Sequence, residues 1–167
     1  DHTLAADYHR VRAMNGDMRR VRLLYRILII SVTALATTVM LLVAPMARTW
    51  MPHQAEVISF LAPIFLFGVI GHCAYITWVK SLIFNKRSDL LVVGSGTISI
   101  TGVVTAAALV PMYGVVAAAW ASAAMHSFTA LFALGCTAFL NEEPLDFFYP
   151  AGALVFSGFI MFWLTVT

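Results

Sequence analysis

The sequence predicts an all-α polytopic membrane protein with about five transmembrane helices. Hydrophobic residues make up 61% of the 167 residues and charged residues only 11%, whereas a soluble domain carries about 25% charged residues. The apolar residues fall into five stretches that can each cross a bilayer, which takes roughly 20 residues. Each stretch must be helical, because the hydrocarbon core offers the backbone no hydrogen-bond partners.

The chain divides into a basic segment, residues 1–23, and a transmembrane helical bundle, residues 24–167. In the basic segment, apolar residues recur at helical spacing, at Val11, Met14, Met18, Val21 and Leu24. With arginines between them, they indicate either an amphipathic helix on the membrane surface or a solvated cytoplasmic linker that packs on other helices. The predicted spans are residues 24–44, 57–79, 90–110, 114–139 and 149–167.

The third span contains the stretch GSGTISITG, Gly94 to Gly102. No strand precedes it and the third glycine of a dinucleotide fingerprint is missing, which favours a transmembrane helix over a phosphate-binding loop. Its small residues fall on two faces, one through Ser95 and one through Thr97, about 200° apart. Such residues let helices pack closely in lipid. The alternative is that one hydroxyl face lines an aqueous cavity.

The fourth span opens with GVVAAAWASAA, which is dominated by glycine, alanine and serine. A helix of this composition can pack closely against the third span, across a short turn near Pro111. The two spans are therefore predicted to form an antiparallel hairpin.

The basic residues predict the orientation of the chain. When successive loops alternate sides, nine lysines and arginines fall on one side and only Arg48 on the other. By the positive-inside rule, the N-terminal flank is cytoplasmic, and we expect a multi-pass membrane protein. Trp50, Trp78, Tyr113 and Tyr149 fall near predicted membrane interfaces, where such aromatic residues prefer to lie.

The spans show no pattern typical of catalysis. They contain no paired carboxylates, no metal-ligand spacing and no nucleophile elbow, one of which a membrane hydrolase or phosphotransferase would need. The sequence therefore predicts no enzyme, no metal or cofactor site and no nucleic-acid partner. Cys73 and Cys136 lie in apolar runs and are interpreted as small buried hydrophobic residues.

Two histidines within the spans are the main candidates for function, because ionisable groups are costly in a bilayer. His126 lies near the middle of the fourth span, with Ser122 and Thr129 on the same face. His72 lies deep in the second span, at a similar depth. One interpretation is that the pair lines a polar translocation path or relays a proton. The alternative is two neutral histidines that are hydrogen-bonded within the bundle.

Ser95, Thr97, Arg26 and Arg48 complete the candidate substrate path. Arg26 opens the first span and either snorkels to the headgroups or faces a cavity as a cation. Arg48 falls in the predicted outer loop, 44–56, and is either solvated or meets an anionic substrate at the outer mouth.

The stretch LVPMYGVVAAAWASA resembles a motif of the polysaccharide (oligosaccharide-lipid) flippases, in the multidrug/oligosaccharidyl-lipid/polysaccharide exporter superfamily. That family often shows Pro-x-x-Gly-x-x-Gly-Ala-Ala-x-Ala-Thr at the start of a late helix. The matching positions are Pro111, Gly114, Ala118, Ala119 and Ala121, with Ala117 in place of the second glycine and Ser122 in place of threonine. Many members carry asparagines before the proline, where this chain has serines and threonines.

Two further stretches carry the resemblance. PMARTWMPHQAEVISFLAP is similar to the family's short outer loop and the helix that follows it, and NKRSD is similar to its basic inner loop. The resemblance implies a transporter of 12 to 14 helices in two pseudo-symmetric halves. It implies that this chain, which begins at Asp1 and ends at Thr167 in an apolar run, is a fragment covering most of the C-terminal half.

The resemblance also implies a function. Such proteins flip undecaprenyl-pyrophosphate-linked sugar units across the bacterial inner membrane by alternating access. The implied partners are membrane lipid, the polyprenyl-linked oligosaccharide and the N-terminal half of the same chain, with a polysaccharide polymerase or glycosyltransferases as further partners. Two alternatives stay open: a multidrug or small-solute exporter of the same superfamily, and a non-transporting scaffold subunit of a polysaccharide-synthesis complex.

Overall fold

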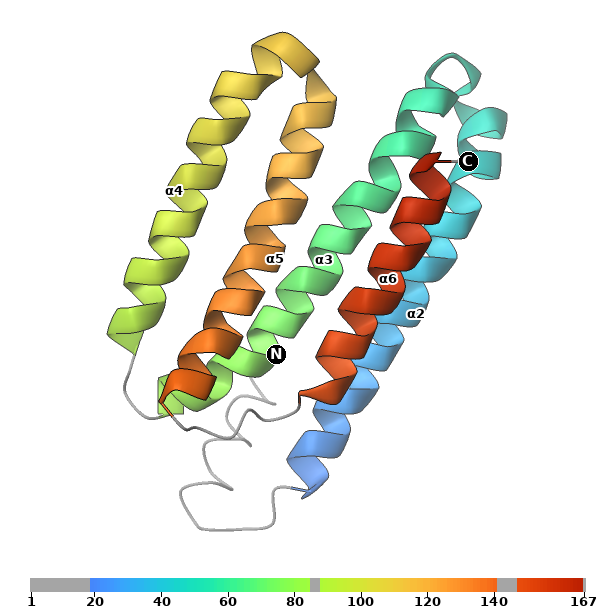
Figure 1. The fold of residues 1–167 in the computed structure, drawn as a ribbon. Helices are drawn as coiled ribbons and strands as arrows, with labels where there is room; N and C mark the ends of the chain where they lie inside the picture. Colours follow the sequence, from blue (N-terminus) through green and yellow to red (C-terminus); the bar gives the residue numbers. More distant parts are fainter. Residues whose placement is uncertain (1–18, 85–87, 141–146, 167) are drawn as a thin grey trace.

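The computed structural model describes residues 19–84, 88–140 and 147–166. This part of the chain is all-helical and contains five long helices (Figure 1): α2 (Arg19–Trp50), α3 (Ala55–Phe84), α4 (Ser88–Tyr113), α5 (Val115–Phe139) and α6 (Phe148–Val166). All five are long and apolar enough to cross a membrane. The predicted all-α polytopic fold is therefore confirmed, and the chain is a multi-span helical membrane protein.

Helix α2 differs most from its predicted span, because it begins at Arg19 and continues to Trp50. Only Met51 and the short 3-10 helix η1 (Pro52–Gln54) separate it from α3, so the predicted loop 44–56 is wrong over most of its length. The physical reason is that a helix can extend beyond the hydrocarbon core. Even Pro45, which lacks a backbone N–H, lies inside α2.

The basic segment 1–23 lies mostly outside the described residues. Its last five residues, 19–23, form the first turn of α2, while the apolar pattern at Val11, Met14 and Met18 falls on residues that are not described. On the same side of the bundle, α3 continues to Phe84. Lys80, which follows the predicted span 57–79, is therefore still a helical residue and only 9% exposed.

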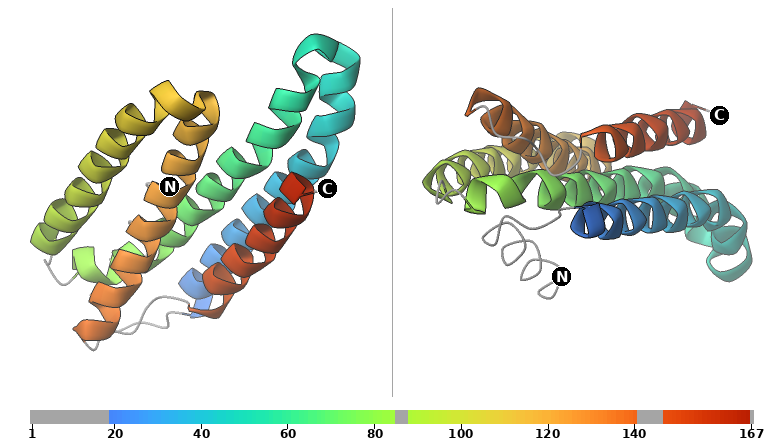
Figure 2. Two further views of the ribbon diagram at one scale, coloured as in Figure 1. Left: turned by 45° about the horizontal axis from the view of Figure 1, so that its top comes forward. Right: turned by 90° about the horizontal axis from the view of Figure 1, so that it is seen from below.

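Helix α3 occupies the centre of the bundle. It contacts α2, α5 and α6 extensively and α4 only slightly. Seen from below (Figure 2, right), α4, α3 and α2 form one row, and α5 and α6 lie on the same side of that row. Helix α5 contacts both α3 and α4, and α6 contacts both α3 and α2.

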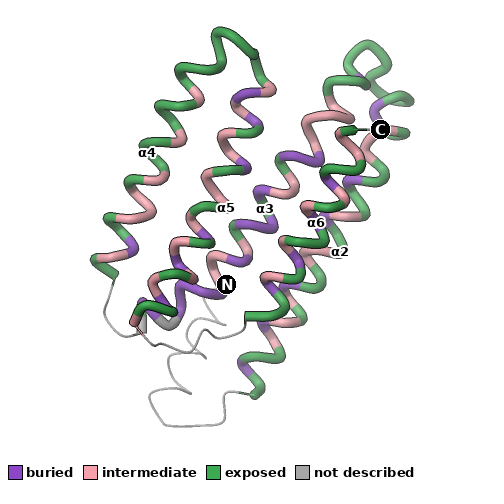
Figure 3. The backbone as a smooth tube through the Cα atoms, viewed as in Figure 1, coloured by how far each residue is buried: buried purple, intermediate pink, exposed green. Residues whose placement is uncertain are grey.

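The core lies around α3, where large side chains are almost fully buried. Trp78, which was predicted to lie at a membrane interface, is only 1% exposed. It packs with Ala74 against Ala130 and Ala133 of α5, because these small residues leave room for the indole. Its position near a membrane interface stays a prediction, and the finding is that the ring is buried within the bundle. Helix α4 is the opposite case, since Leu91 is its buried residue and the described helices leave most of its surface uncovered (Figure 3).

Candidate functional site

The candidate site is built on a close approach of α3 and α5. A Cβ atom added to Gly68 would lie 3.3 Å from Cα of Ala123, and one added to Gly71 would lie 3.3 Å from the backbone N of Ser127. Both contacts are with backbone, so the two helices are nearly as close as glycine allows. Small residues of this kind let helices pack closely in membranes. Sequence reasoning missed both glycines, although their i, i+3 spacing was a visible signal.

This approach brings the two predicted histidines together. The rings of His72 and His126 are 5.4 Å apart between centroids and tilted by 70°, in an edge-to-face arrangement. His126 is half-buried, whereas His72 is exposed. His126 follows the first residue of α5 by 11 positions, which places it about 17 Å along the helix. The pair therefore lies well inside the span of α5.

A third ring adjoins the pair. The ring centroid of Tyr75 lies 6.1 Å from that of His72, one turn further along α3. Sequence reasoning did not select Tyr75, although the i, i+3 spacing places it on the same helix face as His72. The arrangement therefore presents two imidazoles and one phenol, which are groups that can hold or pass a proton or hydrogen-bond an anionic oxygen.

The hydroxyl residues beside His126 on α5 have different surroundings. Ser122 lines a 140 Å³ cavity between α4 and α5, together with Gly102 and Ala106 of α4. The hydroxyl of Thr129 donates to the carbonyl of Met125 at 2.7 Å, so its proton is engaged within the helix. Ser122 therefore lies on the same face of α5 as His126 and also in the contact with α4.

The two hydroxyl residues predicted on α4 lie in different places, as their angular separation requires. Ser95 is half-buried, and its hydroxyl donates to the carbonyl of Leu91. Thr97 lines a 580 Å³ groove between α4 and α5, where Thr101 and Thr105 follow it at steps of one turn. Sequence reasoning missed Thr105, although its four-residue spacing continues the series. The groove is otherwise mainly apolar.

The arginines of α2 are not brought to the histidine pair. Arg26 lies with its guanidinium carbon 4.8 Å from the ring centroid of Tyr149 on α6. Arg48 is exposed in the last turn of α2 and lines a 640 Å³ cavity with Glu56 of α3. The two arginines are 22 positions apart, which corresponds to about 33 Å of helix, close to the roughly 30 Å of a hydrocarbon core. The spacing suits cations that reach opposite membrane surfaces.

The packing motif joins α4 to α5. Pro111 lies in the last turn of α4, and Gly114 turns the chain with a positive φ of 64° and a ψ of −150°. This backbone conformation is essentially restricted to glycine. Ala117 is buried, while Ala118 and Ala121 line the small cavity against α4. The predicted antiparallel hairpin is confirmed.

Within the described ranges, no three His, Cys, Asp or Glu side chains are grouped so that they could hold a metal ion. Cys73 and Cys136 are both free thiols and both partly buried. The site therefore rests on the histidine pair and its hydroxyl neighbours.

A scan against family models and searches of curated proteins and solved structures found no match to this chain.

Proposed function

We propose that this chain forms part of a membrane transporter that flips a lipid-linked oligosaccharide across the bacterial inner membrane by alternating access. The observation that carries the proposal is the contact between His72 and His126, 5.4 Å apart on two different spans. Ionisable groups at membrane depth are costly and usually serve a function. Transporter sites commonly lie near the bilayer midplane, and His126 lies near the middle of α5.

The chemistry of the pair suits an anionic headgroup. A protonated imidazole donates from both ring nitrogens, so two adjacent imidazoles can bind a pyrophosphate, and the Tyr75 hydroxyl can donate to the same oxygens. Charge-assisted hydrogen bonds are about twice as strong as neutral ones. The sugar would meet hydroxyl groups such as that of Ser122. The resemblance of the Pro111–Ser122 segment to the flippases supplies the substrate class.

The uncovered surface of α4 supports a larger assembly. Ser99, Thr101 and Thr105 are exposed on this helix, and hydroxyl groups in lipid are stabilised when another helix packs on them. We infer that further helices, such as those of a second transporter half, cover this surface. A polysaccharide polymerase or glycosyltransferases would act before or after the flipping step.

A scaffold subunit without transport is the second candidate function, and one observation favours it. The backbone contacts at Gly68 and Gly71 hold α3 and α5 together, so the histidine rings can be read as part of a fixed packing contact. In a scaffold, removal of the imidazoles would leave function intact. The two candidates therefore predict opposite results for the same variant.

The experiment uses the full-length protein in proteoliposomes that contain a fluorescent lipid-linked oligosaccharide. Flipping is measured as protection of the fluorophore from a membrane-impermeant quencher. Hydrogen bonds to charged groups contribute about 1.5–3 kcal/mol each, so the double variant His72→Gln, His126→Gln should flip at least about tenfold more slowly. His53→Gln is the matched control, because His53 is exposed in η1, 19 positions before His72 in the chain.

Variant protein must be present at wild-type levels and melt at a similar temperature. Flipping at the wild-type rate by the double variant would contradict the site assignment. No flipping by the wild-type protein in the same vesicles would contradict the transporter proposal and favour the scaffold.

A further inference from the structure

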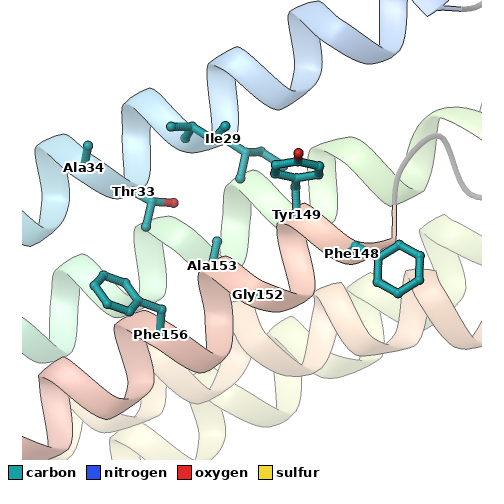
Figure 4. A pocket seen from close by; sticks show the side chains of 9 residues that line it. Ile29, Thr33, Ala34, Phe148, Tyr149, Gly152, Ala153 and Phe156 are labelled. Atoms are coloured by element: carbon teal, nitrogen blue, oxygen red, sulfur yellow. The ribbon is translucent and has the colours of Figure 1, made fainter.

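Two cavities adjoin helix α2, and they differ in charge. One is a groove between α2 and α6 with a volume of 430 Å³, lined mainly by apolar side chains such as Ile29 and Phe156 (Figure 4). The other has a volume of 640 Å³ and is lined by Arg48 and Glu56. Both volumes fall within the range of about 300–1,000 Å³ that is typical of ligand sites. We call the second one the charged cavity, because of the two it is the one with charged side chains among its described lining residues.

The charged cavity lies where three helices end near one another. Arg48 lies in the last turn of α2 and Glu56 in the first turn of α3, and α6 reaches the same end of the bundle (Figure 1). Leu164 and Thr165 line the cavity from α6. Only Met51 and η1 separate α2 from α3, so this short connection places Arg48 and Glu56 on one cavity.

The charged groups of Arg48 and Glu56 are available to a ligand. They are the only lysine, arginine, aspartate or glutamate residues between positions 27 and 79. Both are exposed, no ion pair joins them, and neither side chain hydrogen-bonds another residue of the described part of the chain. Each complements the dipole of its own helix end, but that interaction leaves the N–H donors and the carboxylate oxygens unused. An unpaired cation and anion on one cavity can bind a ligand that carries both charges.

Most of the remaining lining of the charged cavity is apolar. Met40 and Leu41 line it from α2, and Phe60 lines it from α3. Met40 precedes Arg48 by eight positions, which corresponds to about 12 Å of helix, and it is only 1% exposed. The cavity therefore runs from two opposite charges into the apolar part of the bundle, and its occupant needs both a charged head and an apolar chain.

We propose that the charged cavity binds one phospholipid whose headgroup carries a primary ammonium, as that of phosphatidylethanolamine does. The phosphate accepts hydrogen bonds from the Arg48 guanidinium, whose fork of N–H donors matches phosphate oxygens. The ammonium donates to the Glu56 carboxylate, which accepts at both oxygens. The first part of an acyl chain packs against Met40, Leu41 and Phe60. The proposal is independent of the transport function.

The two charges predict a selectivity among phospholipids. Phosphatidylcholine has the same phosphate, but its quaternary ammonium has no N–H to donate to Glu56. Phosphatidylglycerol has no ammonium, so the Glu56 carboxylate repels its negative charge. All three lipids can fill the apolar part of the cavity equally well. The preference for phosphatidylethanolamine therefore reports on Glu56, and the total phospholipid retained reports on Arg48 and on the cavity.

The test is native mass spectrometry of the full-length protein after incubation in detergent with equal amounts of the dioleoyl forms of the three lipids. The wild-type protein should retain one phosphatidylethanolamine in preference to the other two lipids. Glu56→Gln should lower that preference about fivefold, the upper end of what an ion pair open to solvent contributes. Asp89→Asn is the matched control, because Asp89 is also an exposed acid in the first turn of a helix, and it should leave the preference unchanged.

Two further variants test the phosphate contact and the cavity. Arg48→Gln should lower the retention of all three lipids, whereas Arg20→Gln should not, because Arg20 is an exposed arginine at the other end of α2. Ala44→Leu fills the cavity, which Ala44 lines, and should abolish retention. Ala108→Leu is its control, since Ala108 is exposed on α4. If Arg48→Gln does not fold, Arg48→Lys keeps the charge and should keep the retention, while Ala44→Leu still tests the site.

A soluble competitor distinguishes a lipid from a small zwitterion. Glycerophosphoethanolamine carries the same two charges without acyl chains, and an equal amount of it should not displace the bound lipid. Displacement would mean that the cavity recognises a soluble zwitterion, which would overturn the lipid assignment.

Three other results would also overturn the proposal. An unchanged preference in Glu56→Gln, or an equal loss in Asp89→Asn, would mean that Glu56 does not select the headgroup. Unchanged retention by Arg48→Gln would remove the phosphate contact. Full retention by Ala44→Leu would place the bound lipid elsewhere on the surface.

Discussion

Replacing the two glycines between α3 and α5 tests the packing that brings the histidines together. In the interior of an ordinary helix, Gly→Ala is favourable by about 1 kcal/mol, because alanine loses less backbone entropy. At Gly68 and Gly71 the added methyl groups would lie 3.3 Å from backbone atoms of α5. Backbone cannot rotate away as a side chain can, so α5 must shift by a few tenths of an ångström.

The expected magnitude follows from these contacts. Overpacking of a well-packed core costs about 1–3 kcal/mol. One shift of α5 relieves both contacts, so the destabilising effects of the two substitutions are not additive. We expect the double variant to lose about 2 kcal/mol of unfolding free energy relative to the same substitutions at uncrowded glycines. For a chain of this size this corresponds to a melting temperature roughly 4–8 °C lower. The reference is Gly96→Ala, Gly135→Ala, where the added Cβ atoms meet nothing within 4 Å.

The assay is thermal unfolding in detergent. Unfolding is monitored through the reaction of the Cys73 and Cys136 thiols with a fluorogenic maleimide. Both thiols are free and partly buried, so unfolding exposes them. The double variant Gly68→Ala, Gly71→Ala should melt roughly 4–8 °C below the reference variant. If it melts at the same temperature or above, α3 and α5 are not in backbone contact at these glycines, and the geometry inferred for the histidine pair is refuted.

Two further predictions use the same assay. Gly114→Ala should lower the melting temperature, because the φ of 64° and ψ of −150° at Gly114 cost a residue with a side chain about 1–3 kcal/mol; a value equal to that of Gly135→Ala would contradict this. Gly94→Ala should melt below Gly135→Ala, because the new Cβ atom would lie 2.0 Å from Cζ of Phe132 and the ring must turn aside, and Phe132→Leu in the same chain should restore part of that difference. Simple additivity of the last two changes would show that the residues are not in contact.

The sequence by itself determined the class of the protein. Five apolar stretches of membrane length can only be helices in lipid, and the structure places helices over all of them. It also determined which ionisable residues lie within the spans, because the sequence shows His72 and His126 inside apolar stretches. The hairpin of α4 and α5 could also be predicted from the sequence, since Gly114 and the alanines after it allow a turn and close packing.

Helix ends were less predictable from the sequence. Hydropathy marks where a helix enters lipid, but α2 continues past that point to Trp50, since backbone hydrogen bonding does not end at the membrane surface. Trp78 shows a related limit. An amphipathic ring near the end of a span can face either the lipid headgroups or the other helices, and the alanines of α5 hold this one between the helices.

Only the tertiary structure decided which candidate residues meet. His72 and His126 are 54 residues apart in the chain, and their contact depends on Gly68 and Gly71 allowing α5 to approach α3. Arg26 was an equally plausible member of the same site, yet it lies against α6 beside a groove that no sequence pattern indicated. Periodicity assigns a residue to a face of its own helix, but packing determines which helix that face meets.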